Sequence, residues 1–387
     1  GESMHRYSEL QFLHPTHLPS RFAPSRMLPP PLHLAGAIGS LRFLTASQKR
    51  GIRRTMFRLM RTGSESLRDQ TAAQWLGDQQ QDSNAIAKFW DVVLVSALGE
   101  QTEVVSMAAA RKVFVDGFAA ARGASDVLVP KQPLVELFGR DLCAEIKCLG
   151  ARVRTGSAVS KIHCEENRLV AVETVAGQRY AADHVISAVP WHAFGALATQ
   201  IGLSDHRSID QIPSSPITGL HLWFDRQITE LPHAVMVGTL TQWVFRQPFR
   251  SAGPESGCYY QVVISASPAQ RTISKDQLLC TVLGELAHAF PAARSAQLLR
   301  SRIVTDPHSV FSLSPAVQRL RPPNRTPLPW FHLAGDWIDT GWPATMEGAV
   351  ISGRMAAASV LQSEGLSGIT IDPGLRRGLL ARFMITQ

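Results

Sequence analysis

The sequence predicts a mixed α/β protein built from two interleaved modules. Three observations favour this class: helical periodicity dominates up to about residue 130, short β-type runs follow it, and the chain closes on a strand, an elbow and a long helix between residues 331 and 361. A length of 387 residues allows two domains, and 45% hydrophobic with 18% charged residues is ordinary globular composition.

The first 100 residues combine a proline-rich stretch with helices. Residues 11–33 are rich in proline and histidine and predict a linker-like or extended segment with little regular structure. Residues 49–61 predict a helix whose arginines lie opposite an apolar face formed by Ile52, Met56, Leu59 and Met60. A further helix is expected over residues 83–98, with Ser83 or Asn84 as its cap.

The pattern changes near residue 130. An amphipathic helix is predicted over residues 134–150, closing on Gly150, and short β-type runs broken by turns follow it up to residue 183. The apolar run at residues 184–190 suits a strand that is buried on both faces. Further strands are expected at residues 216–225 and 258–266, followed by a helix that begins after Ser274.

The closing segment, residues 331–361, is arranged to approach a ligand closely. Gly335 permits a sharp turn after a short strand, Asp336 presents a carboxylate at the end of that strand, and Gly341 permits a second close approach. Pro343 suits the first position of a helix whose positive end attracts electron-rich groups. Small residues recur every four positions along this helix, at Ala344, Gly348, Ser352 and Ala356. The spacing alone fits equally a tightly packed strand–loop–helix without a ligand.

The composition favours an anionic partner and gives no sign of a metal site. The net charge of +8 suits a lipid surface or nucleic acid, although no aromatic–basic motif supports the latter. The cysteines, Cys143, Cys148, Cys164, Cys258 and Cys280, form no C-x-x-C pair and predict reduced cytoplasmic thiols. His14 and His17 are expected to be solvated rather than metal ligands, and no apolar run of about 18 residues predicts a membrane span.

The segment "LAGDW…TGWPATMEGAVISGRMAA" resembles the C-terminal FAD-binding signature of the flavin amine oxidase and phytoene desaturase superfamily. Four more segments narrow the resemblance to one group within this superfamily: "FWDVVLVSALGE", "GFAAARGASDVLVPKQPLVELF", "PITGLHLWFDRQITELP" and "QWVF". Together they are similar to the squalene-associated FAD-dependent desaturases, also called hydroxysqualene dehydroxylases, of bacterial hopanoid synthesis. The resemblance runs from about Phe22 to Leu361.

The resemblance implies FAD as cofactor and a set of residues that bind it. Asp336, after Gly335, would contact the ribityl-phosphate region, and Val159 and Pro190 would lie near adenine. The loop and helix start would pass along the flavin ring, which implicates Gly341, Trp342, Pro343, Ala344, Thr345 and Met346. Backbone N–H groups there would stabilise negative charge on the reduced flavin.

The resemblance also implies an FAD/NAD(P)-binding Rossmann-like domain that is incomplete at its N-terminus, because the family's opening G-x-G-x-x-G unit does not occur in this sequence. We expect either that the natural N-terminus has been cut or that the chain is a degraded copy. The expected order is substrate domain (1–128), FAD-binding domain (129–200), substrate domain (201–325), FAD-binding domain (326–363) and basic tail (364–387). The substrate domain would combine a mixed sheet with helices.

The activity implied by the resemblance is that of an FAD-dependent oxidoreductase. The first expectation is reductive removal of the hydroxyl of hydroxysqualene to give squalene, with reduced flavin as the hydride source. The alternatives are a phytoene-type desaturase, an amine oxidase and an inactive truncated remnant. The sequence identifies no catalytic acid or base.

Two further features leave alternatives open. Arg122, Ser125 and Asp126 suit either a substrate-pocket wall or a helix cap formed by Ser125 or Asp126. The basic helix at residues 50–61 and the tail at residues 374–384 suit docking on an anionic membrane or ordinary solvated helix faces. The expected location is cytoplasmic, peripheral on the inner face of the cell membrane.

Overall fold

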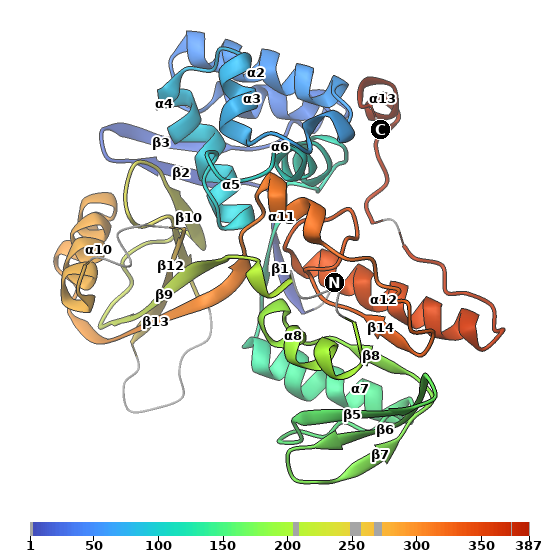
Figure 1. Ribbon diagram of the computed structural model, residues 1–387. Helices are drawn as coiled ribbons and strands as arrows, with labels where there is room; N and C mark the ends of the chain where they lie inside the picture. The colour runs from blue at the N-terminus through green and yellow to red at the C-terminus, as the bar shows by residue number, and fades with distance from the viewer. Residues whose placement is uncertain (1–2, 204–208, 248–256, 267–272, 373, 387) are drawn as a thin grey trace. The chain divides into compact units, whose positions relative to one another are not determined.

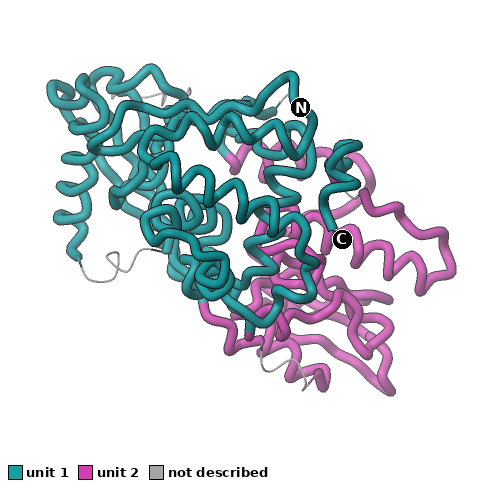
Figure 2. The backbone as a smooth tube through the Cα atoms, turned by 90° about the horizontal axis from the view of Figure 1, so that it is seen from above, with its two compact units in different colours: residues 1–133, 214–315, 375–387 teal, residues 134–213, 316–374 magenta. Residues whose placement is uncertain are grey.

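The computed structural model describes residues 3–203, 209–247, 257–266, 273–372 and 374–386, and its chain divides into two compact units (Figure 2). Unit 1 comprises residues 1–133, 214–315 and 375–387, and unit 2 comprises residues 134–213 and 316–374. The mixed α/β class is confirmed. The assignment of the stretches to a substrate domain and a flavin-binding domain, with the boundaries given above, stays a prediction.

Unit 1 is organised around a seven-stranded sheet in the described residues, with strand order β13-β9-β12-β11-β10-β2-β3 (Figure 1). Neighbouring strands are antiparallel except β10 and β2, which are parallel. The strands are β2 (Leu10–His14), β3 (His17–Phe22), β9 (Ser214–Phe224), β10 (His233–Met236), β11 (Trp243–Arg246), β12 (Cys258–Ser265) and β13 (Leu298–Phe311). β9 and β12 confirm the strands predicted at residues 216–225 and 258–266. A separate antiparallel pair joins β1 (Met4–Tyr7) to β4 (Val127–Pro130).

One face of this sheet is covered by α10 (Lys275–Ala289). Its N-cap is Ser274, as predicted: the Ser274 hydroxyl accepts a hydrogen bond from the Gln277 N–H, and the Gln277 side chain accepts one from the Ser274 N–H. Three apolar residues of the helix recur at helical spacing and pack with alternate residues of β9, so that the cluster contains Leu278, Val282, Leu286, Leu220, Leu222 and Phe224.

The other helices of unit 1 are η1 (Leu32–Leu34), α1 (Ala35–Gly39), α2 (Ala46–Arg61), η2 (Glu65–Leu67), α3 (Ala72–Asp78), α4 (Ser83–Ala85), η3 (Ile86–Trp90), α5 (Asp91–Leu98), α6 (Met107–Arg111), η4 (Lys112–Ala119), η7 (Pro291–Arg294) and α13 (Leu379–Met384). The predicted apolar face of α2 is buried, which confirms that helix. The predicted cap at Ser83 or Asn84 is wrong. Asp82 is the cap, because its backbone is extended and its carboxylate accepts a hydrogen bond from the Ala85 N–H.

The expectation of little regular structure over residues 11–33 is wrong for the first part of that stretch. β2 and β3 form a hairpin in which Leu10 pairs with Phe22 and His14 pairs with His17. The prolines that suggested a linker fit this hairpin for two reasons. Pro15 lies in the turn, and Pro19 lies in β3, an edge strand of the sheet, where a missing N–H group breaks no ladder.

Unit 2 contains two small sheets in its described residues. The first is an antiparallel sheet of β5 (Val159–Glu165), β6 (Arg168–Thr174) and β7 (Arg179–Ala181), which confirms the predicted short strands. The second pairs β8 (Val185–Ser187) with β14 (Phe331–Leu333) in parallel register. The helices are η5 (Val135–Asp141), α7 (Leu142–Cys148), α8 (Trp191–Gln200), α11 (Pro315–Leu320) and α12 (Met346–Ser363).

The prediction that residues 184–190 form a strand buried on both faces is wrong. Strand β8 covers only three residues, and Ile186 in its centre is 44% exposed, whereas all of β14 is buried. Within the described residues, the β8–β14 sheet has only these two strands. The helix predicted over residues 134–150 is confirmed as η5 followed by α7, yet none of the residues of these two helices is buried.

Candidate functional site

The elbow after β14 requires a glycine. Gly335 has φ of +137°, a conformation that side chains disfavour, and a Cβ atom there would lie 2.6 Å from the Trp337 Nε1 atom. The preceding residue, Ala334, donates its N–H to the carbonyl of Ser187 at the end of β8 (2.9 Å). The Trp337 ring is fully buried and donates its N–H to the carbonyl of Val189 (3.1 Å). Backbone and indole together therefore fix the elbow against the segment after β8.

A buried arginine holds the loop that follows the elbow. Arg321 is 6% exposed, and its guanidinium donates to four loop carbonyls, those of Asp336 (3.2 Å), Trp337 (3.4 Å), Ile338 (2.5 Å) and Trp342 (2.7 Å). Burial lowers the pKa of Arg321 to about 10, and the charges of Asp339 and Asp336 oppose this shift. The guanidinium therefore stays charged at neutral pH and orders residues 336–342. No sequence pattern indicated this role.

The carboxylate of Asp336 lies partly buried at the end of β14. Burial raises the pKa of Asp336, and the backbone N–H groups of Asp336 and Trp337 and the Arg321 charge act in the opposite direction. A carboxylate in this position suits a donor such as a ribose or ribityl hydroxyl, because it is an acceptor already shielded from bulk water.

Helix α12 begins at Met346 rather than at Pro343. Thr345 is the N-cap, and its hydroxyl accepts a hydrogen bond from the Gly348 N–H (3.1 Å). The prediction that Pro343 is the first helical residue is therefore wrong, because the Thr345 side chain caps the helix two residues further on. The N–H groups of Met346 and Glu347 remain without partners inside the helix, which is the usual property of a helix start.

The small-residue stripe of α12 is its packing face. Ala344, Gly348, Ser352 and Ala356 are all buried. The Ser352 hydroxyl accepts the Gly335 N–H (2.7 Å) and donates to the Ala349 carbonyl (2.7 Å), so it ties the helix to the elbow. The sequence indicated a close approach here, but not this hydrogen bond. This hydrogen bond ties the second turn of the helix to the residue that precedes Asp336.

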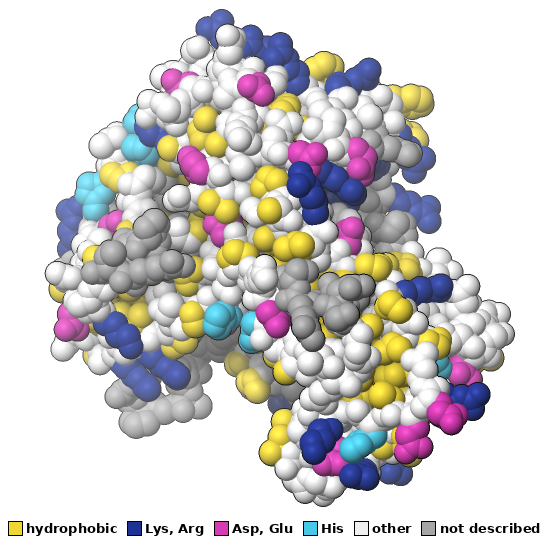
Figure 3. Space-filling view, viewed as in Figure 1, with side chains coloured by type: hydrophobic (Ala, Val, Ile, Leu, Met, Phe, Trp, Pro, Cys, Tyr) yellow, Lys and Arg dark blue, Asp and Glu magenta, His cyan; other side chains and the backbone are white. Residues whose placement is uncertain are grey.

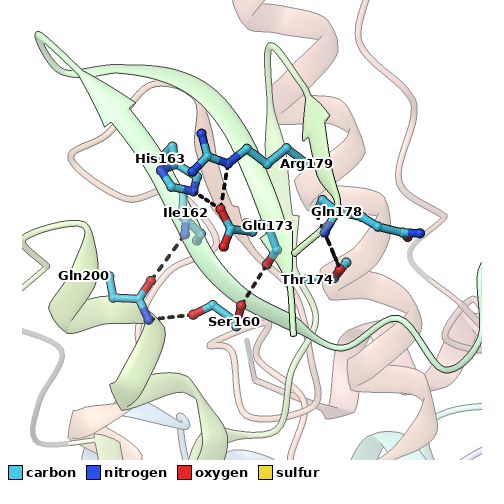
Figure 4. Close-up of polar contacts among 8 residues, drawn as sticks. All are labelled: Ser160, Ile162, His163, Glu173, Thr174, Gln178, Arg179 and Gln200. Carbon is cyan, nitrogen blue, oxygen red and sulfur yellow. Dashed lines mark hydrogen bonds and ion pairs between the residues drawn. The ribbon is translucent and has the colours of Figure 1, made fainter. Parts of the chain in front are cut away.

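The two residues expected near adenine, Val159 and Pro190, lie on elements that are tied together. Val159 opens β5 and is 45% exposed, and Pro190 is the N-cap residue of α8. At the other end of α8, the Gln200 side chain donates to the Ser160 carbonyl (3.0 Å) and accepts from the Ile162 N–H (3.3 Å), as Figure 4 shows. The structure does not test the contacts of Val159 and Pro190 with adenine.

A second set of contacts in Figure 4 holds the small sheet itself. The Glu173 carboxylate of β6 accepts hydrogen bonds from Arg179 of β7 (2.7 Å) and His163 of β5 (2.8 Å). The hydrogen bond from Arg179, followed by that from His163, lowers the pKa of Glu173. This carboxylate therefore joins all three strands, and it is engaged in structure.

The residues around the elbow fit a flavin nucleotide. The Ser187 hydroxyl at the end of β8 is buried, and no hydrogen-bond partner for it occurs in the described part of the chain. Such a buried hydroxyl needs a partner, and a polar ligand would supply one. Together with the Asp336 carboxylate and the first amides of α12, it provides donors and acceptors suited to phosphate and sugar groups. Ser187 was missed by sequence reasoning, because a serine inside an apolar run carries no signal.

Unit 1 contains a cavity of about 450 Å³ with an almost wholly apolar lining. Its walls include residues of β2, η1, α2, η3, α5, η4 and β11, among them Phe12, Leu34, Met56, Phe89, Val93 and Phe114. The polar side chains among its lining residues are those of Arg53, Ser96, Ser125 and Asp126. The Ser96 hydroxyl already accepts the Trp243 indole N–H (2.7 Å). The volume lies within the range of about 300–1,000 Å³ that is typical of ligand pockets.

Ser125 and Asp126 lie in the wall of this cavity, but Arg122 does not. The Ser125 hydroxyl is buried and has no hydrogen-bond partner within the described residues. The Asp126 carboxylate pairs with Arg6 at 3.6 Å, and its side chain is 9% exposed. Neither residue caps a helix, because β4 begins directly after them. Arg122 instead donates to the carbonyls of Ser25, Arg26 and Leu28, which orders the loop at residues 25–28.

The histidine and cysteine side chains of the described residues form no recognisable metal site or disulfide. The His14 and His17 Nδ1 atoms lie 3.1 Å apart beside the β2–β3 turn. Among the described residues, no group of three or more His, Cys, Asp and Glu side chains could hold a metal ion. The five cysteines are unpaired. No helix in the described ranges has the length and apolar character needed to cross a bilayer.

Comparison with known proteins agrees with this geometry. Residues 5–361 match the flavin containing amine oxidoreductase family. The chain is 29% identical over 236 residues to 15-cis-phytoene desaturase, chloroplastic/chromoplastic, of an Oncidium hybrid cultivar, covering 56% of this chain and 39% of the relative. It is 36% identical over 126 residues to hydroxysqualene dehydroxylase of Rhodopseudomonas palustris, covering 33% of this chain and 28% of the relative.

A solved structure of an oxidoreductase from Methanosarcina mazei has a similar fold, with a TM-score of 0.68 at 15% identity over 92% of this chain and 82% of the other. The curated relatives are longer than the region they share with this chain. The matched region spans 39–41% of the length of the first three of them.

Replacing Arg321 by Met should destabilise unit 2. The substitution leaves four loop carbonyls without this donor, and each unsatisfied buried group costs about 1–3 kcal/mol, so we expect a loss of at least about 3 kcal/mol in the free energy of unfolding. Urea denaturation followed by intrinsic fluorescence measures this. The matched control is Arg354→Met on the exposed face of α12, where we expect a change below about 0.5 kcal/mol. Equal curves for the two variants would contradict the role given to Arg321.

Replacing Asp336 by Ala should weaken FAD binding about tenfold or more, because a charge-assisted hydrogen bond contributes about 1.5–3 kcal/mol. Titration of FAD fluorescence quenching measures the dissociation constant without any turnover. Asp339→Ala is the control, since Asp339 is exposed on the same loop. Loss of affinity in the control alone, or equal affinity in both variants, would remove Asp336 from the binding site.

Proposed function

The chain belongs to the flavin containing amine oxidoreductase family, with FAD as its cofactor, and we propose that it acts on a polyprenoid by reductive dehydroxylation of hydroxysqualene to squalene. The observation that carries this proposal is the cavity of unit 1. Its lining is apolar over nearly its whole surface, and it contains one buried hydroxyl, that of Ser125, without a partner among the described residues. A long hydrocarbon with a single hydroxyl group matches that distribution.

The apolar walls would supply affinity and exclude water. Aromatic and aliphatic side chains bury the hydrocarbon at roughly 25 cal/mol per Å² of apolar surface, and they offer a small amine few groups for recognition. The absence of competing polar groups around most of the cavity also keeps a reactive allylic position away from water. This lining favours a polyprenoid over an amine as the substrate.

Ser125 and Asp126 would fix the orientation of the substrate. The Ser125 hydroxyl can donate to or accept from the substrate hydroxyl, and the adjacent Asp126 carboxylate is an acceptor held in place by Arg6. Two polar groups at one point of an apolar cavity hold the carbon–oxygen bond at a defined position. In the overall change, hydroxysqualene and FADH2 would give squalene, water and FAD: the reduced flavin would supply a hydride to carbon and a proton to the departing hydroxyl.

A phytoene-type desaturation is the second candidate. The alignment with the Oncidium phytoene desaturase covers 56% of this chain, compared with 33% for the hydroxysqualene dehydroxylase, although the identity is lower. An apolar cavity suits phytoene as well as hydroxysqualene. The unpartnered Ser125 hydroxyl favours the hydroxylated substrate, since phytoene has no polar group to occupy it. The location on the inner face of the cell membrane stays a prediction.

Product analysis separates the two reactions. The flavin-loaded protein, given hydroxysqualene and a chemical reductant for the flavin, should release squalene, which gas chromatography with mass spectrometry detects. Given phytoene and an electron acceptor instead, it should form no desaturated product. Desaturated phytoene without any squalene would replace the first proposal by the second. The control is Asp336→Ala at an FAD concentration below its dissociation constant.

Replacing Ser125 by Ala tests the orientation of the substrate. The variant should lose about tenfold in kcat/KM for hydroxysqualene, because one hydrogen bond contributes about 1–1.5 kcal/mol. Its thermal stability should be unchanged or slightly higher, since the substitution removes a buried hydroxyl without a partner. The control is Ser96→Ala in the same cavity, whose hydroxyl is already engaged by Trp243. Unchanged kcat/KM in Ser125→Ala would remove Ser125 from the substrate site.

A further inference from the structure

The cavity of unit 1 opens to the surface between α2 and η1. Two of its lining residues, Phe57 of α2 and Leu32 of η1, are 50% and 41% exposed. The other exposed lining residues are Arg53 of α2 and Ser96 of α5, so three of the four lie on α2 and η1, and we infer that the mouth of the cavity is on this side. Arg53 lies beside them, and its guanidinium donates to the Ala35 carbonyl (3.0 Å).

More exposed apolar side chains lie on the segments that adjoin the lining residues Pro31 and Met384. Met27 is 93% exposed, Leu379 is 76% exposed and Phe383 is 81% exposed. With Leu28, Leu32 and Phe57 they form what we call the pocket rim, which comprises Met27, Leu28, Leu32, Phe57, Leu379 and Phe383. Single exposed apolar residues are common, but several of them on segments that adjoin an apolar cavity suit an interaction site.

The pocket rim is built on fixed backbone. Arg122 binds three carbonyls of the loop that carries Met27 and Leu28, and the Ser25 N–H closes that loop onto the His33 carbonyl (2.8 Å). The side chains therefore remain in solvent although the loop is ordered. Their exposure is a property of the native fold and not of a loose end.

Helix α13 is anchored beside this loop. The Gly378 N–H donates to the Ala120 carbonyl (2.9 Å), and a Cβ atom at Gly378 would lie 3.3 Å from Pro30. Arg377 pairs with Asp116 (3.1 Å), and Met384 at the end of α13 lines the cavity. Leu379 and Phe383, four residues apart, share the helix face that points away from these contacts.

A row of arginines on α2 flanks the pocket rim. Five arginines share the exposed face of α2 with Phe57, and the helix has no acidic residue of its own; the row is Arg50, Arg53, Arg54, Arg58 and Arg61. Figure 3 shows Lys and Arg side chains along the edge of the molecule over α2, with hydrophobic side chains between them and the end that carries α13. Apolar side chains inside a basic border match an anionic lipid surface, which presents acyl chains below negative headgroups.

We propose that the pocket rim and the arginine row dock this protein on an anionic lipid bilayer, with the mouth of the cavity against the lipid. The docking itself is independent of the reaction. Transfer of a polyprenoid from the bilayer into the cavity, without passage through water, rests on the proposed function.

Sedimentation with vesicles tests the docking without any turnover. The flavin-loaded protein should bind vesicles of phosphatidylcholine with one-third phosphatidylglycerol at least tenfold more tightly than vesicles of phosphatidylcholine alone, and added salt should weaken this binding. Leu379→Ser combined with Phe383→Ser should reduce binding at least tenfold. Neither residue lines the cavity, so the substitution leaves the substrate site intact. The control is Leu18→Ser with Val304→Ser, at exposed apolar positions outside the pocket rim.

A matched pair of triple variants tests the arginine row. Arg50, Arg54 and Arg61 replaced together by Gln should reduce binding to the anionic vesicles at least tenfold. Arg294, Arg300 and Arg302 are exposed elsewhere on unit 1. Their replacement by Gln removes the same charge and should reduce vesicle binding less than threefold. Equal losses in the two triple variants, unchanged binding in Leu379→Ser/Phe383→Ser, or binding to a short DNA duplex but not to vesicles would overturn the docking proposal.

The transfer step has a separate readout. Leu379→Ser/Phe383→Ser should convert hydroxysqualene in vesicles at least tenfold more slowly than the unmodified protein, and should convert detergent-solubilised hydroxysqualene at the same rate. Equal rates with vesicles would overturn the transfer. Absence of any conversion by the unmodified protein would instead overturn the proposed function and leave the vesicle-binding result unaffected.

Discussion

The buried guanidinium of Arg321 is the contact on which the candidate cofactor site depends. Several backbone carbonyls of residues 336–342 point into the protein. Because these carbonyls are hydrogen-bond acceptors shielded from water, they need a donor with several N–H groups, and a positive charge strengthens the hydrogen bonds. Burial lowers the pKa of Arg321 only to about 10, so the charge persists at neutral pH. Because the loop is held from within, the Asp336 carboxylate and the start of α12 are fixed before any ligand arrives. A ligand then meets an ordered site and spends little binding free energy on ordering it.

The small side chains of α12 have a consequence for the same site. A helix with larger residues at Gly348 and Ser352 would stand further from β14, and the Ser352 hydroxyl could not reach the Gly335 N–H. A Cβ atom at Gly348 would lie 3.0 Å from the Pro343 carbonyl oxygen, so the loop before the helix also depends on that glycine. Close packing therefore positions the first amides of the helix, and the chemistry expected of them follows from the packing.

The sequence predicts the periodic parts of this fold and misses what depends on single contacts. Helices α2 and α10 and strands β5, β6, β9 and β12 follow from side-chain periodicity, because burial of one face imposes it. The β2–β3 hairpin was missed because its prolines are read as breakers, although an edge strand and a turn accept them. The position of Asp336 followed from the elbow. Arg321 was missed because it lies 15 residues earlier in the chain and binds backbone carbonyls, which every residue has, so no residue type in the loop indicates the contact. The start of α12 was misplaced because a proline suits a first turn in general, while the Thr345 hydroxyl decides the actual cap.

The two units differ in how many polar groups their sites contain, and this difference fits the function proposed above. In unit 2 the elbow gathers carbonyls, amides and a carboxylate around a charge, as recognition of a nucleotide requires. In unit 1 the cavity lining has few polar side chains, those of Arg53, Ser96, Ser125 and Asp126, and only the last two are adjacent in the chain. For an amphiphilic substrate, an apolar wall contributes affinity in proportion to buried area but does not select an orientation, because hydrocarbon contacts are non-directional. Two adjacent polar side chains select one, since a hydroxyl placed elsewhere in the cavity would lose its hydrogen bonds with water and gain none. Affinity therefore depends mainly on the apolar walls, and orientation depends on the two polar side chains. The orientation of the substrate can change without loss of the affinity that the apolar walls contribute.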